Sequence, residues 1–418
     1  QGDVDAQTSL TFGRDGRAYI FTDRDAPRGM LLVTTPGSWD PTSWRTLIPE
    51  AQDAVLDSVT LLDGKGLDQD QLLVVHTHHG VAQMAVHTAS DGKFLYPIEL
   101  PGAGTIGGPI EHIDGGPITW IVYTDHTTIP TIYEFDARSR ELTLYATPPG
   151  SVHAPSVHSE LITYPSLDGT TVRMFIISPT GNPDHSRPTI LYGYGGFGIP
   201  MQPGYSASIL AWVESGGVWA IANLRGGGEE GEEWHRAGML AKKQNVFDDF
   251  HAAAEYLIDS GWTTSDQLGI YGGSNGGLLV GAAMTQRPDL FNAVVCVAPL
   301  LDMIRYVESE LGPTWTVEYG DPADPQQFDW LHAYSPYHRV TPGTDYPATM
   351  FAIFDNDTRT DPMHGRKMAA AVQASTSGVR PILVRTEENV GHGARSLSKS
   401  IEESADTLAF MSHWTGLD

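Results

Sequence analysis

The first 150 residues alternate short apolar and polar runs, and no helical period interrupts them. Apolar runs at residues 19–23, 73–77 and 121–125 are each followed by a loop, a second strand pattern and, after a polar turn, a third. An interval of roughly 50 residues is typical of four-stranded propeller blades. We therefore expect residues 1–150 to form an all-β partial β-propeller of about three blades, with a plain β-sandwich as the alternative.

From about residue 151 the pattern changes to apolar runs separated by helical periods. A hairpin is predicted around Asp168-Gly169. Buried strands are predicted at residues 189–192, 218–223, 268–271, 293–297, 349–354 and 382–384, and a one-sided helix at 246–260. Strands that are apolar on both faces and alternate with helices indicate a largely parallel sheet. Residues 151–418 are therefore expected to form an α/β domain.

One predicted strand-to-helix turn, the GGSNGG sequence of residues 272–277, carries candidate chemistry. A serine at such a sharp turn takes a strained backbone conformation, and side chains two positions before and after it would collide. Ser274 therefore requires Gly272 and Gly276. The helix that follows directs its amino end to the place where an oxyanion would form. Glycine-rich turns also occur without any chemistry, so a purely structural turn is the alternative.

A serine nucleophile needs a histidine base and a carboxylate that orients it, expected in the chain order serine, acid, histidine. His392 lies in a glycine-flanked loop after the last predicted strand, which makes it the best candidate among 16 histidines. The loop after the strand at 349–354 offers Asp355, Asp357 and Asp361. Residue spacing alone does not choose among these three carboxylates.

The amino-acid composition limits which ligands and which cellular location are expected for this protein. The 25 Lys and Arg residues against 51 Asp and Glu give a formal charge of −26, which disfavours nucleic acid and anionic membrane surfaces as partners. No stretch approaches the roughly 20 apolar residues of a membrane helix. The lone Cys296 leaves no internal disulfide, which suits a cytoplasmic protein without excluding a secreted one. His76, His78 and His79 lack companion ligands at metal-binding spacing, so no metal site is expected.

Six longer motifs of the second half resemble those of the prolyl oligopeptidase family of serine peptidases. They span most of residues 155–418 and lie at 191–197 (LYGYGGF), 223–229 (NLRGGGE), 272–277, 286–291 (QRPDLF), 315–320 (WTVEYG) and 391–393 (GHG). The GGSNGG turn together with WTVEYG favours the proline-specific branch over the arginine-and-lysine-specific oligopeptidases and the acylaminoacyl peptidases. The likeness over residues 1–150 is looser but agrees with a propeller. The resemblance thus implies an α/β-hydrolase catalytic domain beside the partial propeller.

The resemblance also implies a role for individual residues. It makes Asp357 the acid, and it assigns the oxyanion hole to the hydroxyl of Tyr194 and the backbone N–H of Asn275. Trp315 would stack on the substrate proline ring. The rest of the substrate site would consist of three pocket walls, Phe197, Leu300 and Tyr319, and of Arg359, which would hold a substrate carbonyl one residue upstream. Ordinary core packing is the alternative for each aromatic residue taken singly.

The chain departs from the family pattern in two places. Thr360-Asp361 stands where two valines commonly precede the proline of the acid loop, which predicts a more polar pocket wall and an extra carboxylate near the base. The family also has seven blades and a preceding segment. Because a blade buries both faces against neighbours, we expect an amino-terminal propeller segment to be supplied by a separate or cleaved chain, with pairing of two copies as the alternative.

These observations predict a serine peptidase that hydrolyses short peptides on the carboxyl side of proline through an acyl-enzyme. Ser274 would be the nucleophile, His392 the base and Asp357 its orienting acid. No metal or cofactor is expected. A small-molecule esterase or amidase on the same scaffold and a non-catalytic peptide-binding module are the alternatives.

Overall fold

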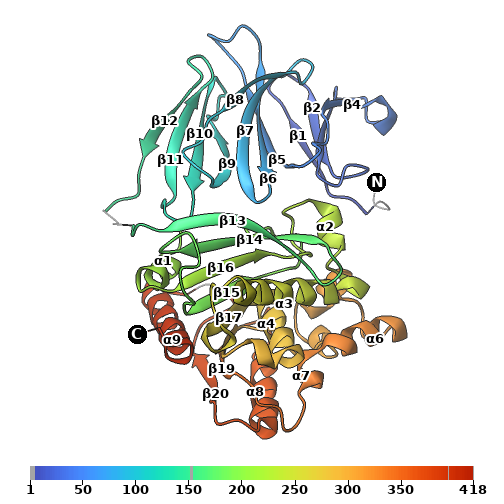
Figure 1. Cartoon of the computed structure of the whole chain (residues 1–418). Helices are drawn as coiled ribbons and strands as arrows, with labels where there is room; N and C mark the ends of the chain where they lie inside the picture. The colour runs from blue at the N-terminus through green and yellow to red at the C-terminus, as the bar shows by residue number, and fades with distance from the viewer. Residues whose placement is uncertain (1–4, 151–153, 394, 418) are drawn as a thin grey trace. The chain divides into compact units, whose positions relative to one another are not determined.

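The computed structural model describes residues 5–150, 154–393 and 395–417. Contacts divide the chain into two units (Figure 1). The first takes in the described part of Gln1–Ala154 together with Gln202–Ser206 and Gly228–Glu233, and the second takes in the remainder. The domain boundary predicted between residues 150 and 151 adjoins residues 151–153, which lie outside the described residues, and it stays a prediction.

The first unit contains three four-stranded antiparallel sheets that follow one another along the chain. The strands of the first sheet are β1 (Thr8–Phe12), β2 (Ala18–Thr22), β3 (Met30–Thr34) and β4 (Arg45–Ile48). Those of the second are β5 (Val55–Leu62), β6 (Gln71–His78), β7 (Val81–Thr88) and β8 (Phe94–Ile98). Those of the third are β9 (Thr105–Glu111), β10 (Ile118–Thr124), β11 (Thr131–Asp136) and β12 (Glu141–Ala146).

The middle sheet is apolar on both of its faces. Successive residues of a strand point to opposite sides, and in β6 this places Leu72 and Val74 in one buried cluster with residues of the first sheet. Leu73 and Val75 lie in a second buried cluster with residues of the third sheet. Two cores on either side of one sheet are expected of propeller blades, whereas a sandwich has a single core.

The second unit is built on one eight-stranded sheet with the order β13-β14-β16-β15-β17-β18-β19-β20. The strands are β13 (His158–Pro165), β14 (Thr171–Ser178), β15 (Thr189–Gly193), β16 (Val218–Asn223), β17 (Leu268–Gly273), β18 (Ala293–Val297), β19 (Ala348–Phe354) and β20 (Ile382–Glu387). The β13–β14 hairpin and the β14–β16 pair are antiparallel, and all the other pairs are parallel. The prediction of a largely parallel α/β sheet is therefore confirmed.

Helices cover both faces of this sheet (Figure 1). They are α1 (Ala207–Glu214), α2 (Glu232–Arg236), α3 (Gln244–Asp259), α4 (Asn275–Gln286), α5 (Thr316–Tyr319), α6 (Pro325–Tyr334), α7 (Pro336–Arg339), α8 (Met363–Ser375) and α9 (Leu397–Thr415). Short 3-10 turns are η1 (Pro41–Ser43), η2 (Leu240–Lys242), η3 (Ser265–Gln267), η4 (Pro288–Leu290), η5 (Tyr306–Glu308) and η6 (Gly312–Trp315). Ile270 of β17 shares a buried core with α3, α4 and α8. The preceding residue, Gly269, faces α9, because a Cβ there would come within 2.7 Å of the sulfur of Met411.

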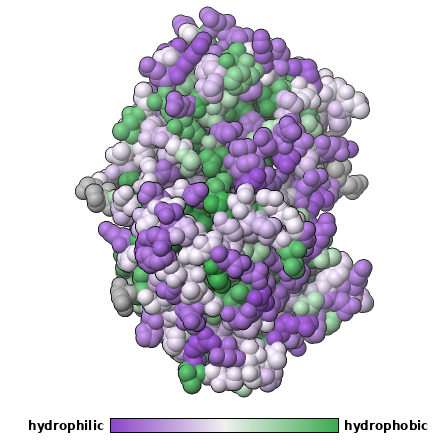
Figure 2. All heavy atoms as spheres, in the orientation of Figure 1, coloured by the Kyte–Doolittle hydropathy of each residue, from purple (hydrophilic) through white to green (hydrophobic). Residues whose placement is uncertain are grey.

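None of the helices in the described part of the chain is long and apolar enough to cross a membrane. On the face of the molecule drawn in Figure 2, hydrophilic residues predominate and hydrophobic ones lie between them.

The turn between β17 and α4 has the strained geometry expected for Ser274, with φ 58° and ψ −118°. A Cβ added to Gly272 would lie 2.1 Å from the carbonyl oxygen of Gly276. One added to Gly276 would lie 2.9 Å from the carbonyl oxygen of Gly193. Both positions are tighter than a side chain tolerates, so the predicted need for glycine at each is confirmed.

Replacing Gly272 with alanine should lower the free energy of unfolding by roughly 1–3 kcal/mol, because the added methyl group overlaps backbone atoms that cannot move freely. The neighbouring Gly273 is a matched control, since a Cβ there meets its nearest atom, the carbonyl oxygen of Val297, only at 3.6 Å. Gly273→Ala should change stability little. Urea unfolding of both variants makes the comparison, and equal losses would contradict the steric account of this turn.

Candidate active site

The predicted catalytic residues follow four neighbouring or nearly neighbouring strands at the carboxyl edge of the sheet. Tyr194 follows β15, Ser274 follows β17, Asp357 follows β19 and His392 follows β20. Loops at this edge are where open α/β sheets assemble their sites. The parallel topology therefore brings residues from distant parts of the sequence to one place.

His392 and Asp357 are in direct contact. The Nδ1 atom of His392 lies 2.7 Å from Oδ2 of Asp357, whose side chain is only 1% exposed. Of the three aspartates left open by residue spacing, Asp357 is thus the one that pairs with His392. Asp355 instead accepts a 2.8 Å hydrogen bond from Arg366, and Asp361 accepts one from the backbone N–H of Met363.

Asp357 remains a carboxylate despite its burial. Burial raises its pKa, but hydrogen bonds from His392 and from the backbone and hydroxyl of Thr360 outweigh that effect and leave the pKa below its ordinary value. Its Oδ1 atom accepts from the backbone N–H groups of Arg359 and Thr360, each at 2.9 Å. The ionised carboxylate can hold the imidazole with Nδ1 protonated, which leaves Nε2 as the basic nitrogen.

Thr360 touches both members of this pair. Its hydroxyl lies 2.9 Å from Oδ2 of Asp357, 3.1 Å from Nδ1 of His392 and 2.9 Å from the carbonyl oxygen of Ala298. The hydroxyl has a single proton, for which Oδ2 of Asp357 and the Ala298 carbonyl compete. When it donates to Asp357, it joins the two backbone N–H groups and His392 as the fourth donor around the buried carboxylate. The sequence identified Thr360 as a polar departure from the family pattern but did not predict these contacts.

Tyr194 lies beside the proposed nucleophile. Burial raises the pKa of its phenol, while a hydrogen bond with the Ser274 side chain opposes that shift. The phenol is therefore protonated at neutral pH and can donate. Helix α4 begins at Asn275, directly after Ser274, and the first N–H groups of a helix have no acceptor in a preceding helical turn. A phenol and a helix amino end together can stabilise an oxyanion.

The predicted pocket aromatics pack edge to face. The ring of Phe197 lies 6.5 Å from that of Trp315 and 5.5 Å from that of Tyr319, with interplanar angles of 76° and 89°. Phe197 and Trp315 are half-buried and pack on the buried core that contains Leu300 and Tyr319. Such T-shaped contacts suit aromatic quadrupoles and leave ring faces for a ligand.

Arg359 is exposed, and its positive charge acts to lower the pKa of Tyr194. Because the side chain is exposed, a ligand can reach its guanidinium.

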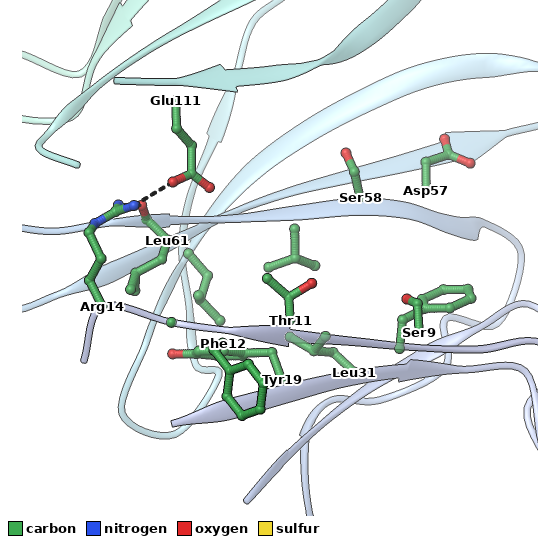
Figure 3. A pocket seen from close by; sticks show the side chains of 14 residues that line it. Ser9, Thr11, Phe12, Arg14, Tyr19, Leu31, Asp57, Ser58, Leu61 and Glu111 are labelled. Carbon is green, nitrogen blue, oxygen red and sulfur yellow. Dashed lines mark hydrogen bonds and ion pairs between the residues drawn. The ribbon is translucent and has the colours of Figure 1, made fainter. Parts of the chain in front are cut away.

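Among the residues that the structure describes, no group of three or more His, Cys, Asp and Glu side chains could hold a metal ion. The lining of a cavity of about 280 Å³ in the first unit includes residues of β1 and β5. Figure 3 shows Arg14 paired with Glu111 on its wall, and Nη1 of Arg14 lies 2.6 Å from Oε2 of Glu111. None of the predicted site residues lines this cavity.

Both halves of the chain match known protein families. The sequence model of the prolyl oligopeptidase family matches residues 203–418, and that of the prolyl oligopeptidase N-terminal beta-propeller domain matches residues 1–148. The prolyl endopeptidase of Elizabethkingia miricola is 38% identical over 406 residues, which cover 96% of this chain and 56% of that protein. Prolyl oligopeptidase ophP of Omphalotus olearius is 34% identical over 424 residues, which cover 99% of this chain and 56% of that protein.

Solved structures give the same result. A structure from an analysis of two prolyl endopeptidases superposes with a TM-score of 0.92 at 42% identity, covering 99% of this chain and 60% of that one. Prolyl oligopeptidase B from Galerina marginata, bound to a 35mer substrate, superposes with a TM-score of 0.91 at 27% identity, covering 99% and 58%. This chain therefore spans somewhat more than half the length of each of these four relatives.

Replacing Thr360 with valine should lower hydrolytic kcat on the order of ten-fold, because a hydrogen bond to a charged group is lost while the side-chain shape is kept. Thr360→Ser, which retains the hydroxyl, should remain near the parent rate. Steady-state kinetics on a peptide amide measures both variants.

Thr349 provides a matched control for this prediction. It is also fully buried, and its hydroxyl donates to the carbonyl oxygen of Pro347, at the end of β19 away from the site. Thr349→Val should reduce stability without a comparable loss of kcat. Equal kcat losses in Thr360→Val and Thr360→Ser would show that the hydroxyl is not what matters.

Proposed function

Because this chain belongs to the prolyl oligopeptidase family, we propose that it is a serine peptidase that hydrolyses short peptides on the carboxyl side of proline. The observation that carries the proposal is the Asp357–His392 pair, which follows β19 and β20 at the same edge of the sheet as Ser274 on its strained strand-to-helix turn. Fold alone does not imply an activity, whereas this arrangement supplies a nucleophile, a base and an oriented acid.

The proposed reaction is an acyl transfer in two steps. Ser274 Oγ attacks the carbonyl carbon of the substrate proline while His392 removes its proton, and Asp357 stabilises the imidazolium that forms. The Tyr194 hydroxyl and the Asn275 N–H donate to the oxyanion of the tetrahedral intermediate. His392 then gives its proton to the leaving amine, and a water molecule releases the peptide acid by the reverse sequence.

Specificity for proline would come from the aromatic cluster. The proline ring is apolar and compact, and it fits against the face of Trp315 with Phe197 and Tyr319 at its sides. Leu300 belongs to the apolar core beneath these rings. Arg359 would hold a substrate carbonyl one residue upstream, so it would assist peptides more than single-residue amides.

No observation favours a simple esterase or a non-catalytic binding module over this proposal. A cytoplasmic location is likewise proposed on composition alone, and cell fractionation tests it.

In the homologues the propeller is part of the same chain as the peptidase domain, as the three blades are here. A further propeller segment on a separate or cleaved chain remains a proposal, and the intact mass of every polypeptide in the purified sample tests it.

Ser274→Ala and His392→Ala should each reduce kcat on a proline-linked amide by about 10⁴ to 10⁶, and the double variant should lose little more, because the residues act as a unit. Steady-state kinetics and labelling by a fluorophosphonate measure the effect. Ser215→Ala, an exposed serine at the end of α1, is the control and should keep full activity. Unreduced turnover in Ser274→Ala would exclude this mechanism.

Trp315→Ala should reduce the discrimination between proline and larger residues by about 1–3 kcal/mol while fluorophosphonate labelling stays intact. Trp315→Phe retains an aromatic face and should lose less. The ratio of kcat/KM for matched proline and leucine amides is the measurement. A uniform loss on every substrate would indicate that Trp315 has only a structural role.

A further inference from the structure

Two buried charged residues, Lys243 and Glu318, form an ion pair that contacts the loop after β15 and takes no part in the chemistry described above. We propose that they are positioning residues, which hold the loop of residues 194–197 so that Tyr194 and Phe197 stay in place together. The proposal rests on the proposed function, and it assigns to this ion pair the coupling of the oxyanion donor to the proline pocket.

The loop needs external support because its backbone is strained. Phe197 has a φ of 59°, in the left-handed region that non-glycine residues rarely adopt. Gly195, two positions earlier, has a φ of 62°. A conformation of this kind persists only where surrounding contacts impose it.

Three polar contacts impose this conformation, one at each of three successive points of the loop backbone. The carbonyl oxygen of Tyr194 accepts a 2.5 Å hydrogen bond from Nδ2 of Asn275, and that of Gly195 accepts a 2.8 Å bond from Nζ of Lys243. The backbone N–H of Phe197 also interacts with the carboxylate of Glu318 and acts to lower the pKa of that group. Lys243 and Glu318 thus account for two of the three contacts.

The ion pair is itself closed to water. The side chains of Lys243 and Glu318 are 1% and 2% exposed, and Nζ lies 3.3 Å from Oε1. The other carboxylate oxygen, Oε2, lies 2.8 Å from Nε2 of His235. Burial raises the pKa of Glu318, but Lys243, His235 and the Phe197 N–H outweigh it and leave the pKa lowered.

Stability alone gives little reason to keep such a pair. A buried ion pair can often be exchanged for apolar residues of similar volume without loss, because desolvation offsets the attraction between the charges. What apolar residues could not do is donate to Gly195 and accept from Phe197. The geometry of the loop is therefore the property that this pair maintains.

The same network extends into the proline pocket. Tyr319, next to Glu318, donates its hydroxyl to Oδ1 of Asn275 at 2.8 Å, and its ring meets that of Phe197 edge to face. Nζ of Lys243 lies 5.3 Å from the centre of the Tyr319 ring. These contacts connect Tyr194 to Phe197 by way of Asn275, Tyr319 and Glu318. We therefore expect that a displacement of any one of these residues shifts the others.

This arrangement predicts a distinctive kinetic result. Loss of the oxyanion donor alone, as in Tyr194→Phe, should lower kcat for every substrate. Loss of the surface that stacks on proline alone, as in Trp315→Ala, should lower discrimination between proline and other residues. Loss of the ion pair should lower both quantities together.

The test is the double variant Lys243→Met/Glu318→Leu, which removes both charges and leaves neither one buried without its partner. We expect kcat on a proline amide to fall at least about ten-fold and the proline-over-leucine ratio of kcat/KM to fall at least several-fold, with a thermal midpoint near that of the parent. Lys243→Met/Glu318→Gln restores an acceptor for the Phe197 N–H and should recover part of both losses. Arg287→Met/Glu255→Leu, at an exposed ion pair of the same unit, should change neither quantity.

A folded Lys243→Met/Glu318→Leu protein with parental kcat and parental discrimination would overturn the proposal. If that variant does not fold, Lys243→Met alone decides. It removes the donor to the Gly195 carbonyl while Glu318 keeps His235 as a partner, so parental values of both quantities in it would overturn the proposal equally. Failure of the proposed function is distinct, because the parent protein would then show no turnover of proline amides and no fluorophosphonate labelling dependent on Ser274.

Discussion

The strained turn at Ser274 is the constraint on which the rest of the second unit depends. A serine with a φ of 58° is maintained there because its N–H donates to Val297 at the end of β18 and because α4 starts at the next residue. Gly272 and Gly276 allow strand and helix to approach each other closely. Strand β15, which pairs with β17, and strand β19, which lies beyond β18, then determine where the loops that carry Tyr194 and Asp357 can lie.

An ionised, buried carboxylate occurs twice in and beside the site. Asp357 and Glu318 are both buried carboxylates, and each is held in the ionised form by several donors from different segments. The first orients the base. The second, in our proposal, orients the loop that carries the oxyanion donor. In both cases the desolvation of a charge is offset by contacts that also fix a geometry, which explains how a reaction site can be rigid although its residues lie on loops.

Much of this organisation could be predicted from residue patterns. Apolar runs and helical periods identified the strands of both units, since burial on one or two faces leaves a clear period in the sequence. The GGSNGG turn and the glycine-flanked His392 were recognisable because each needs particular residues at particular positions. The choice of Asp357 over Asp355 and Asp361 came from family resemblance, and spacing had left it open because all three lie in one loop.

The sequence by itself determined the two fold classes, the nucleophile turn and the chain order of the candidate triad, because these follow from local periodicity and local steric needs. The tertiary structure alone decided which groups touch. Thr360 reaches His392 across 32 positions of sequence, and Lys243 reaches Glu318 across 75. No local pattern marks such pairs, because a buried Lys or Glu looks like any surface charge until the sheet has brought distant loops to one edge and excluded water between them.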